Sequence, residues 1–227
     1  MSRRPDSDIR TALIDSAARL FSEAGPAALS ARRVAAEADT STMAIYTHFG
    51  SMSELIREIA REGFSRLAQM FTKVEPTDDA VADMAYLGRV YRRNANINRY
   101  LYSVMFGGDS LQGFALTEAD RQNGRYTLSP VIDCARRCIE TGRFRSDDPV
   151  LVAHQMWLGV HGTVTLEIGG YLIDPWSASK CFEAQLVSLM VGAGDSLASA
   201  VQSVAVSAER FAKWPTPGED ALADDGD

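Results

Sequence analysis

Five side chains that could face a nucleic acid occur close together near the N-terminus of the sequence. They are Thr42, Met43, Tyr46, Thr47 and His48. Helical spacing places them on the outside of one short helix, whose inner face would carry Ala44, Ile45 and Phe49. A short helix that presents small, polar and aromatic side chains suits insertion into the major groove of DNA.

Neighbouring elements must hold this helix in place. A helix over 42–47 is too short to be stable alone, so its buried face needs support from other segments. Ser41 is a candidate N-cap for it, and Ser30 is a candidate N-cap for a preceding helix with apolar Val34 and Ala38. The sequence therefore predicts two short helices joined by a tight turn.

The stretch 13–55 resembles the N-terminal domain of TetR-family transcriptional regulators. The family pattern is a helix that ends in Leu-Phe and a Gly, a helix capped by Ser or Thr, a turn, and a recognition helix with Tyr-x-x-Phe. The corresponding elements here are Leu20-Phe21, Gly25, Ser30, Tyr46 and Phe49, followed by 51–55. The resemblance implies a helix-turn-helix that binds double-stranded DNA.

The resemblance also implies which residues contact a DNA operator. Tyr46 and His48 would hold phosphates, whereas Thr42, Met43 and Thr47 would lie nearer the base edges. The full set includes residues that would brace the adjacent backbone. The predicted DNA-binding residues are Ser30, Arg32, Ser41, Thr42, Met43, Tyr46, Thr47 and His48.

Three positions depart from the family pattern. Asp39 occupies the turn position that is usually Gly, and it suits this position because Asp tolerates a left-handed backbone. Thr42 stands where the family commonly has a basic residue, and Met52 stands where it commonly has a Lys that meets a phosphate. The difference at Met52 predicts one fewer contact with the DNA backbone.

The composition predicts an all-α protein in the cytoplasm. Helix formers dominate the 227 residues, proline clusters at predicted helix boundaries, and no strand or hairpin pattern is present. The sequence has no apolar run long enough for a membrane span, no signal-peptide core at its start, and only three cysteines. We therefore expect no membrane association.

The net charge of −7 is distributed unevenly along the chain. Residues 1–66 hold nine Arg and nine acidic residues, whereas the segment 214–227 holds five acidic residues and no base. A neutral DNA-binding head releases few counterions, so its non-specific DNA affinity should be modest. The composition of the acidic tail predicts disorder.

We predict three parts of the chain. These are a helix-turn-helix DNA-binding domain at 1–50, a larger helical ligand-binding and dimerisation domain at 51–213, and the tail at 214–227. Besides the two short helices, the expected helices span 8–24, 51–74, 77–94, 96–106, 117–123, 129–142, 148–169 and 177–214.

The last two predicted helices are too apolar to stand singly, and small residues would let them approach a partner closely. The expected solution is a four-helix bundle between two copies of the chain, and TetR-like regulators form homodimers in this way. The segment 157–162 also resembles a Trp-x-x-x-His-Gly signature in the C-terminal domain of one subgroup.

Aromatic and methionine side chains are frequent between the head and the last helices. An ordinary core explains most of them singly, whereas together they predict an apolar effector pocket with a few polar points, as TetR-like proteins usually have. Arg92, Arg93 and Arg99 could recruit an anionic head group, although solvated arginines are commoner. The candidate ligand-binding residues are Met84, Tyr91, Tyr102, Met105, Phe106, Phe114, Tyr126, Trp157 and His161.

The sequence predicts no cofactor, no metal and no catalytic site. Cys134 and Cys138 lie one helical turn apart, and we interpret them as buried small side chains rather than as a thiol switch or metal site. No phosphate-binding loop, nucleophile elbow or zinc-protease motif is present. We therefore expect that the protein is not an enzyme.

These features predict a ligand-responsive transcriptional regulator. It would be a homodimeric repressor that binds a palindromic operator and is released by a small apolar or amphipathic effector. The alternative is an all-α small-molecule or protein-binding module with a degenerate DNA-binding head, a hypothesis favoured by the neutral head, Thr42 and Met52. A helical-bundle enzyme ranks third.

Overall fold

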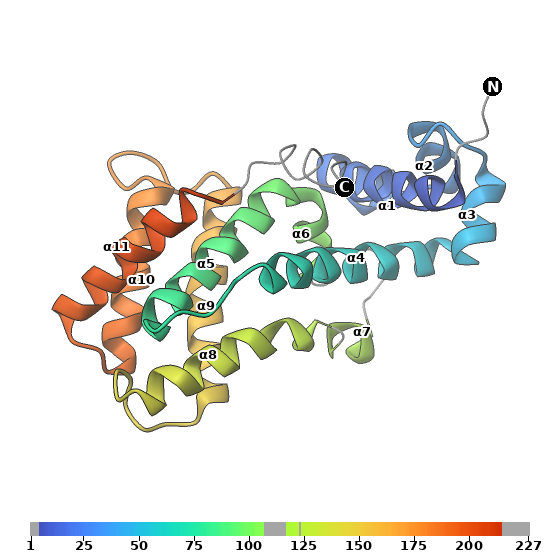
Figure 1. Cartoon of the computed structure of the whole chain (residues 1–227). Coiled ribbons are helices and arrows are strands. Elements are labelled where there is room, and N and C mark those ends of the chain that lie inside the picture. The colour runs from blue at the N-terminus through green and yellow to red at the C-terminus, as the bar shows by residue number, and fades with distance from the viewer. Residues whose placement is uncertain (1–4, 107–116, 123, 215–227) are drawn as a thin grey trace, which may run out of the picture. The chain divides into compact units, whose positions relative to one another are not determined.

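The computed structural model describes residues 5–106, 117–122 and 124–214 (Figure 1). This part of the chain is all-α, as predicted, and contains no strand. None of its helices is both long enough and apolar enough to cross a membrane. The helices are α1 Asp6–Ala24, α2 Ala31–Glu37, α3 Thr42–Phe49, α4 Met52–Thr72, α5 Ala80–Ile97, α6 Arg99–Met105, α7 Glu118–Gln122, α8 Ser129–Glu140, α9 Pro149–Ile168, α10 Ala178–Ala193 and α11 Leu197–Phe211.

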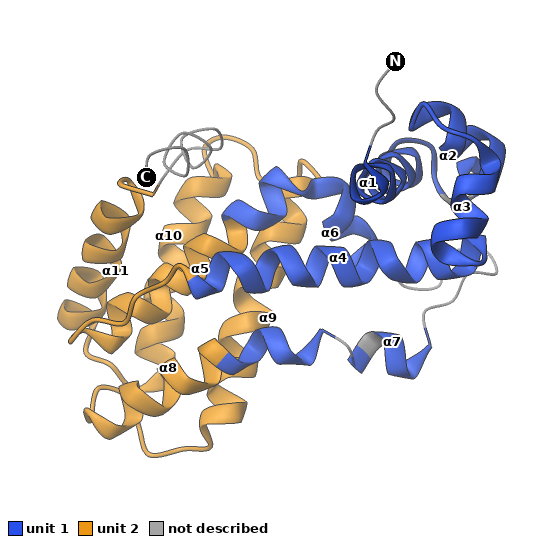
Figure 2. Cartoon of the chain, turned by 45° about the vertical axis from the view of Figure 1, so that its right-hand side comes forward, with its two compact units in different colours: residues 1–72, 93–129 blue, residues 73–92, 130–227 orange. Residues whose placement is uncertain are grey.

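The chain divides into two compact units (Figure 2). Unit 1 comprises residues 1–72 and 93–129, and unit 2 comprises residues 73–92 and 130–227. The division falls inside α5, so this one helix contributes to both units. The predicted domain boundaries at 50 and 213 stay predictions, and residues 215–227 of the predicted tail lie outside the described residues.

Unit 1 is built around one apolar core that includes the two short helices. Ile45 of α3 is fully buried in it, together with Leu13 of α1 and Val34 of α2. The later helix α6 supplies Leu101 and Val104 to the same core. Burying a side chain of this size contributes roughly 1.5–3 kcal/mol, so this core supplies the support that the short helices lack by themselves.

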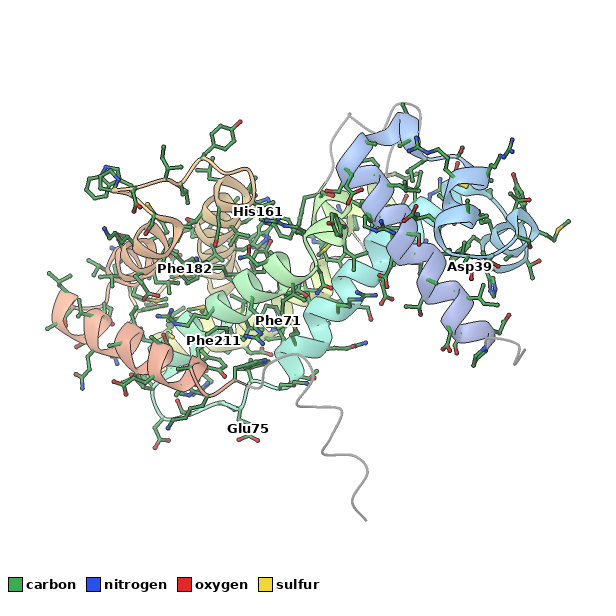
Figure 3. The ribbon with its side chains drawn as sticks, turned by 90° about the horizontal axis from the view of Figure 1, so that it is seen from above. Asp39, Phe71, Glu75, His161, Phe182 and Phe211 are labelled. Atoms are coloured by element: carbon green, nitrogen blue, oxygen red, sulfur yellow. The ribbon has the colours of Figure 1, made fainter. Side chains whose placement is uncertain are left out.

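The start of each short helix is fixed by a local hydrogen bond. Ser30 Oγ accepts a hydrogen bond from the Arg33 backbone N–H at 3.3 Å, and Ser41 Oγ accepts one from Ala44 N–H at 3.3 Å. Such caps contribute about 1 kcal/mol each. Asp39 in the turn between the helices has φ 51° (Figure 3). Both caps and the left-handed turn residue are confirmed predictions.

Unit 2 packs the first part of α5 against α9 and α10. Phe182 and Leu186 of α10 and Val160 of α9 are buried there. A Cβ atom at Gly88 would lie 3.2 Å from Leu186 Cδ2 and 3.4 Å from Val160 Cγ2, so α5 comes close to both helices at this position. Figure 1 shows α9 and α10 packed along each other.

The predicted single helix over 177–214 is wrong, because the structure divides it into α10 and α11. Gly194 follows α10 and has φ 119°, a backbone conformation that residues other than glycine rarely adopt. Arg145 N–H donates to Ala193 O at 2.9 Å, and Ser196 caps α11 by accepting from Ser199 N–H at 3.1 Å. The break is therefore held by a contact from a distant segment as well as by its own sequence.

Ion pairs with a buried carboxylate attach α11 to the rest of unit 2. Asp83 of α5 is buried and accepts from Arg210 Nη1 at 2.6 Å and from Arg137 Nη1 at 3.0 Å. Burial alone would raise the pKa of Asp83, but hydrogen bonds from Thr77, Arg210 and Arg137 lower it below its ordinary value. Asp83 therefore stays charged and paired at neutral pH.

Candidate nucleic-acid interface and ligand-binding clusters

The outer face of α3 carries the predicted reading side chains. Met43 is 68% exposed and Tyr46 is 50% exposed. Thr42 and Thr47 are also exposed, whereas the predicted inward residue Ile45 is fully buried. The face is accessible to a large partner and carries hydroxyl, thioether and phenol groups.

His48 differs from the prediction that it lies on the outside of this helix. Its side chain is only 9% exposed, and its Nε2 lies 3.5 Å from a carboxylate oxygen of Asp6 at the start of α1. A phosphate approaching His48 would meet the negative charge of Asp6. The role of His48 as a phosphate contact therefore stays a prediction that needs Asp6 to move.

The helix before the turn presents two cationic side chains. Arg32 and Arg33 of α2 are both exposed, and no carboxylate of the described residues lies within ion-pair distance of either guanidinium. Ser30 is exposed at the start of the same helix. Arg33 was not among the predicted DNA-binding residues, although it stands next to Arg32 in the sequence.

The described arginines of α1 and α4 are paired with carboxylates. Arg10 pairs with Glu58, and Arg19 pairs with Glu37. In α4, the remaining pairs are Arg57 with Glu54 and Asp120, Arg61 with Glu58 and Asp120, and Arg66 with Glu62 and Asp15. Surface pairs of this kind contribute about 0–1 kcal/mol each, but they neutralise the positive charge of α4 locally.

The N-terminal residues 1–66 are therefore neutral overall, but their positive charge is distributed unevenly. Among the described residues, α2 carries cations without an ion-pair partner, beside the uncharged outer face of α3. Arginine side chains can hold phosphates, and small or apolar side chains can contact base edges. This arrangement can bind a DNA backbone through α2 and read its bases through α3.

Three predicted ligand-binding residues meet in unit 2. Tyr91 Oη and His161 Nδ1 form a hydrogen bond of 2.9 Å. The centre of the Trp157 ring lies 5.4 Å from that of His161 and 6.5 Å from that of His154. Burial lowers the pKa of His161, so its imidazole is neutral at physiological pH. The cluster is aromatic and can also form hydrogen bonds.

A second group of predicted ligand-binding residues lies in unit 1. The Tyr102 and Phe106 rings are 5.2 Å apart, and Phe106 meets Phe64 at 5.6 Å. Met105 packs so closely on Gly63 that a Cβ atom there would lie 2.4 Å from its sulfur.

Of the remaining candidates, Met84 is buried in α5 of unit 2, and Tyr126 of unit 1 is 52% exposed. Phe114 lies outside the described residues.

Arg92 was a candidate for an anionic ligand, and the structure gives it a protein partner. Its Nε and Nη2 donate to the Glu167 carboxylate at 2.7 and 2.8 Å. The guanidinium also lies 4.8 Å from the centre of the Phe182 ring. This two-point pair joins α5 to α9 and is a structural contact of unit 2.

The predicted burial of the cysteine pair is confirmed. Cys134 and Cys138 are both buried, and Cys134 Sγ donates to Ala80 O at 3.2 Å. Its hydrogen bond with Cys138 and its burial raise the pKa of Cys134 far above the ordinary range. A thiol that stays protonated is a poor nucleophile and a poor metal ligand.

Family models match both parts of the chain. The model for bacterial regulatory proteins of the tetR family matches residues 13–59, and the model for the tetracyclin repressor-like C-terminal domain matches residues 84–189. Together they cover more than half of the sequence. The chain belongs to the TetR family of transcriptional regulators. As a TetR-family regulator it combines a helix-turn-helix DNA-binding domain with a ligand-binding C-terminal domain.

Solved structures share the fold at low sequence identity, and no curated protein matches the sequence. A Rhodococcus protein of unknown function is 24% identical over 82% of this chain and 96% of its own, with a TM-score of 0.68. The TetR-family regulator PfmR from Thermus thermophilus is 22% identical over 81% and 99%, with a TM-score of 0.59. RolR in complex with resorcinol is 17% identical over 93% and 96%, with a TM-score of 0.59.

The exposed arginines of α2 should set the salt dependence of DNA binding. We expect Arg32→Gln and Arg33→Gln to weaken binding to all DNA sequences alike. Each should lower the slope of log affinity against log salt by about one for every phosphate that the variant no longer binds. Titrations at several salt concentrations measure this slope. Arg136→Gln removes the same charge from unit 2 and should leave the slope unchanged; equal effects of all three variants would contradict the assignment.

The low pKa of His161 should make the folded chain less stable in mild acid. Below the unfolded pKa of about 6.5, the unfolded chain takes up a proton that folded His161 resists. The stabilising effect of neutral His161 is therefore complete above that pH and is lost as the pH falls toward the lower folded value. Urea unfolding at pH 7.5 and 5.5 should show a smaller loss of stability in His161→Gln. An identical loss in both proteins would refute this role.

Proposed function

We propose that this TetR-family regulator is a homodimeric repressor that binds a palindromic operator and leaves it when a small effector binds. The observation that carries the proposal is the exposed, uncharged outer face of α3, held by capped short helices beside Arg32 and Arg33. A dimer would place two such helices about 34–36 Å apart, in successive major grooves. The operator would then consist of two inverted half-sites.

Exposed apolar side chains on α9 support dimerisation. Leu151, Leu158 and Leu166 lie on one face of α9 and are 48%, 60% and 47% exposed. The connection from α9 to α10 exposes Tyr171, Ile173 and Trp176. Several exposed large apolar side chains on one helix and the connection that follows it are typical of a protein interface. We propose that α9 and α10 pair with the same helices of a second copy in an isologous four-helix bundle.

The cluster of unit 2 supports a small effector that is apolar or amphipathic. Trp157 offers an aromatic surface, and the Tyr91–His161 pair offers hydrogen-bonding groups beside it. RolR, whose structure contains resorcinol, shows that a relative of this fold holds a small aromatic compound. An effector can release the operator only if it binds the free and DNA-bound conformations with different affinities.

One observation favours the alternative of a binding module with a degenerate head. The α4 arginines nearest the predicted reading helix in sequence are already paired with carboxylates, Arg57 with Glu54 and Arg61 with Glu58. If these pairs persist, the head neutralises few phosphates. The alternative predicts weak DNA binding without sequence preference, whereas the repressor predicts tight binding to one palindrome.

Binding to the DNA upstream of the gene, at two salt concentrations, tests the repressor. We expect one palindrome to be bound tightly and less so at higher salt. Tyr46→Phe should weaken this binding about tenfold or more, because the hydroxyl would donate a hydrogen bond to a charged phosphate. The variant keeps the ring and so controls for folding. Sequence-blind binding by the unmodified protein would favour the alternative.

The effector site is tested by operator release. Small aromatic and amphipathic compounds are screened for release of the operator from the protein. A compound that releases the operator from the unmodified protein should not release it from His161→Phe, or should do so only at a much higher concentration. This change removes the hydrogen-bonding imidazole but keeps an aromatic ring. Unchanged sensitivity of His161→Phe would place the effector elsewhere.

The dimer is tested by placing a charge on its proposed surface. Leu158→Glu should convert the dimer to a monomer and weaken operator binding, because two buried carboxylates would face each other near the symmetry axis. Light scattering after size-exclusion chromatography measures the mass. Val201→Glu, at a residue of α11 that is 50% exposed, is the matched control and should remain a dimer. The reverse pattern would move the interface to α11.

A further inference from the structure

The predicted recognition helix, α3, lacks the side chains that usually recognise purines. Arg and Lys form paired hydrogen bonds with guanine, and Asn and Gln do so with adenine. The α3 sequence TMAIYTHF contains none of these four residue types. Its weakly exposed His48 faces Asp6. Sequence recognition by α3 must therefore depend on hydroxyl groups and on apolar contacts.

Met43 is the apolar group best placed for such a contact. It is the most exposed large apolar side chain among the described residues of unit 1, and it is the second residue of α3 after the Ser41 cap. The first residues of a recognition helix are those that contact base edges. Ile45, the other large aliphatic residue of α3, is fully buried, so its apolar side chain is accounted for by the core. The core gives no such reason for an apolar side chain at Met43.

The major groove offers one apolar group to such a side chain, the C5-methyl group of thymine. A methionine has three flexible bonds and a polarisable sulfur, so it can adapt its end to a methyl group. Thr47 is exposed one helical turn after Met43 and carries a methyl group of its own. The outer face of α3 thus matches a thymine better than it matches any other base.

We propose that Met43 determines operator specificity by packing against a thymine methyl group in each half-site. This inference rests on the proposed DNA binding and names the base that the α3 face selects. Affinity and specificity are then carried by different helices. Arg32 and Arg33 of α2 supply the phosphate contacts, which weaken with salt, whereas the methyl contact is apolar and its discrimination does not depend on salt.

The test removes the methyl group alone. The preferred site is first selected from random DNA with the full chain, and each thymine in a half-site is then replaced by deoxyuridine, which lacks only the C5-methyl. We expect one or two positions at which this replacement weakens binding about fourfold per half-site, the effect of one buried methyl group. The same factor should be measured at low and at high salt.

Two variants of Met43 assign the effect to this residue. Met43→Ala removes the apolar end, and it should bind thymine and deoxyuridine sites equally well. Met43→Leu keeps an apolar end and should retain most of the discrimination. Met43 is exposed and Ala is the best helix former, so loss of folding does not confuse the result. Circular dichroism and the melting temperature of each variant verify this.

The outcomes separate this inference from the proposed function. A selected palindrome whose thymines can all be replaced without loss would overturn the Met43 proposal and leave the repressor intact. A methyl effect that is unchanged in Met43→Ala would also overturn it and would assign the contact to another residue. Failure to select any sequence would overturn the repressor proposal and the Met43 proposal together.

Discussion

The burial of Ile45 is the interaction on which the DNA-binding head depends. A helix of eight residues cannot persist alone in water, and α3 contributes a single large aliphatic residue to the core while its other face is exposed. Ile45 belongs to one apolar cluster together with side chains of α1, α2, α4 and α6. The packing of Ile45, together with that of Phe49, therefore sets the orientation of the outer face, on which Thr42, Met43, Tyr46 and Thr47 are exposed.

The arginines of the DNA-binding head likewise fall into two groups, those paired within the protein and those without an ion-pair partner in the part of the chain that the structure describes. Net charge suggests a poor DNA-binding protein, but the distribution of ion pairs matters more than the sum. Arg10, Arg19 and Arg66 are held by carboxylates of unit 1, so their charges act mainly within the protein. Arg32 and Arg33 have no such partner among the described residues, so they keep their charge for an external anion.

The helices of unit 2 are joined by ion pairs as well as by apolar contacts. Asp83 holds Arg137 and Arg210, and Asp195 holds Arg143 at 2.7 Å. Removing Arg143 would leave the buried charge of Asp195 without this arginine partner, which is strongly destabilising. The polar contacts therefore fix which helices pair, while Leu151, Leu158 and Leu166 of α9 remain exposed.

What the sequence determined by itself is the set of features that depend on neighbours a few residues away. The caps Ser30 and Ser41, the left-handed Asp39 and the helical class of the chain all follow from short-range hydrogen bonding and backbone preference. The exposure of Thr42, Met43, Tyr46 and Thr47 followed from helical periodicity, which decides which residues share a face, whereas His48, predicted on the same face, is covered beside Asp6.

Only the tertiary structure decided the features that join distant parts of the chain. Asp6 meets His48, α6 completes the core around α3, Arg145 holds the break before α11, and Tyr91 meets His161. Each contact depends on how whole helices pack, and helix periodicity contains no information about which helix lies opposite. Packing also divided the predicted ligand-binding residues between two units, because aromatic composition alone cannot tell which side chains share a cluster.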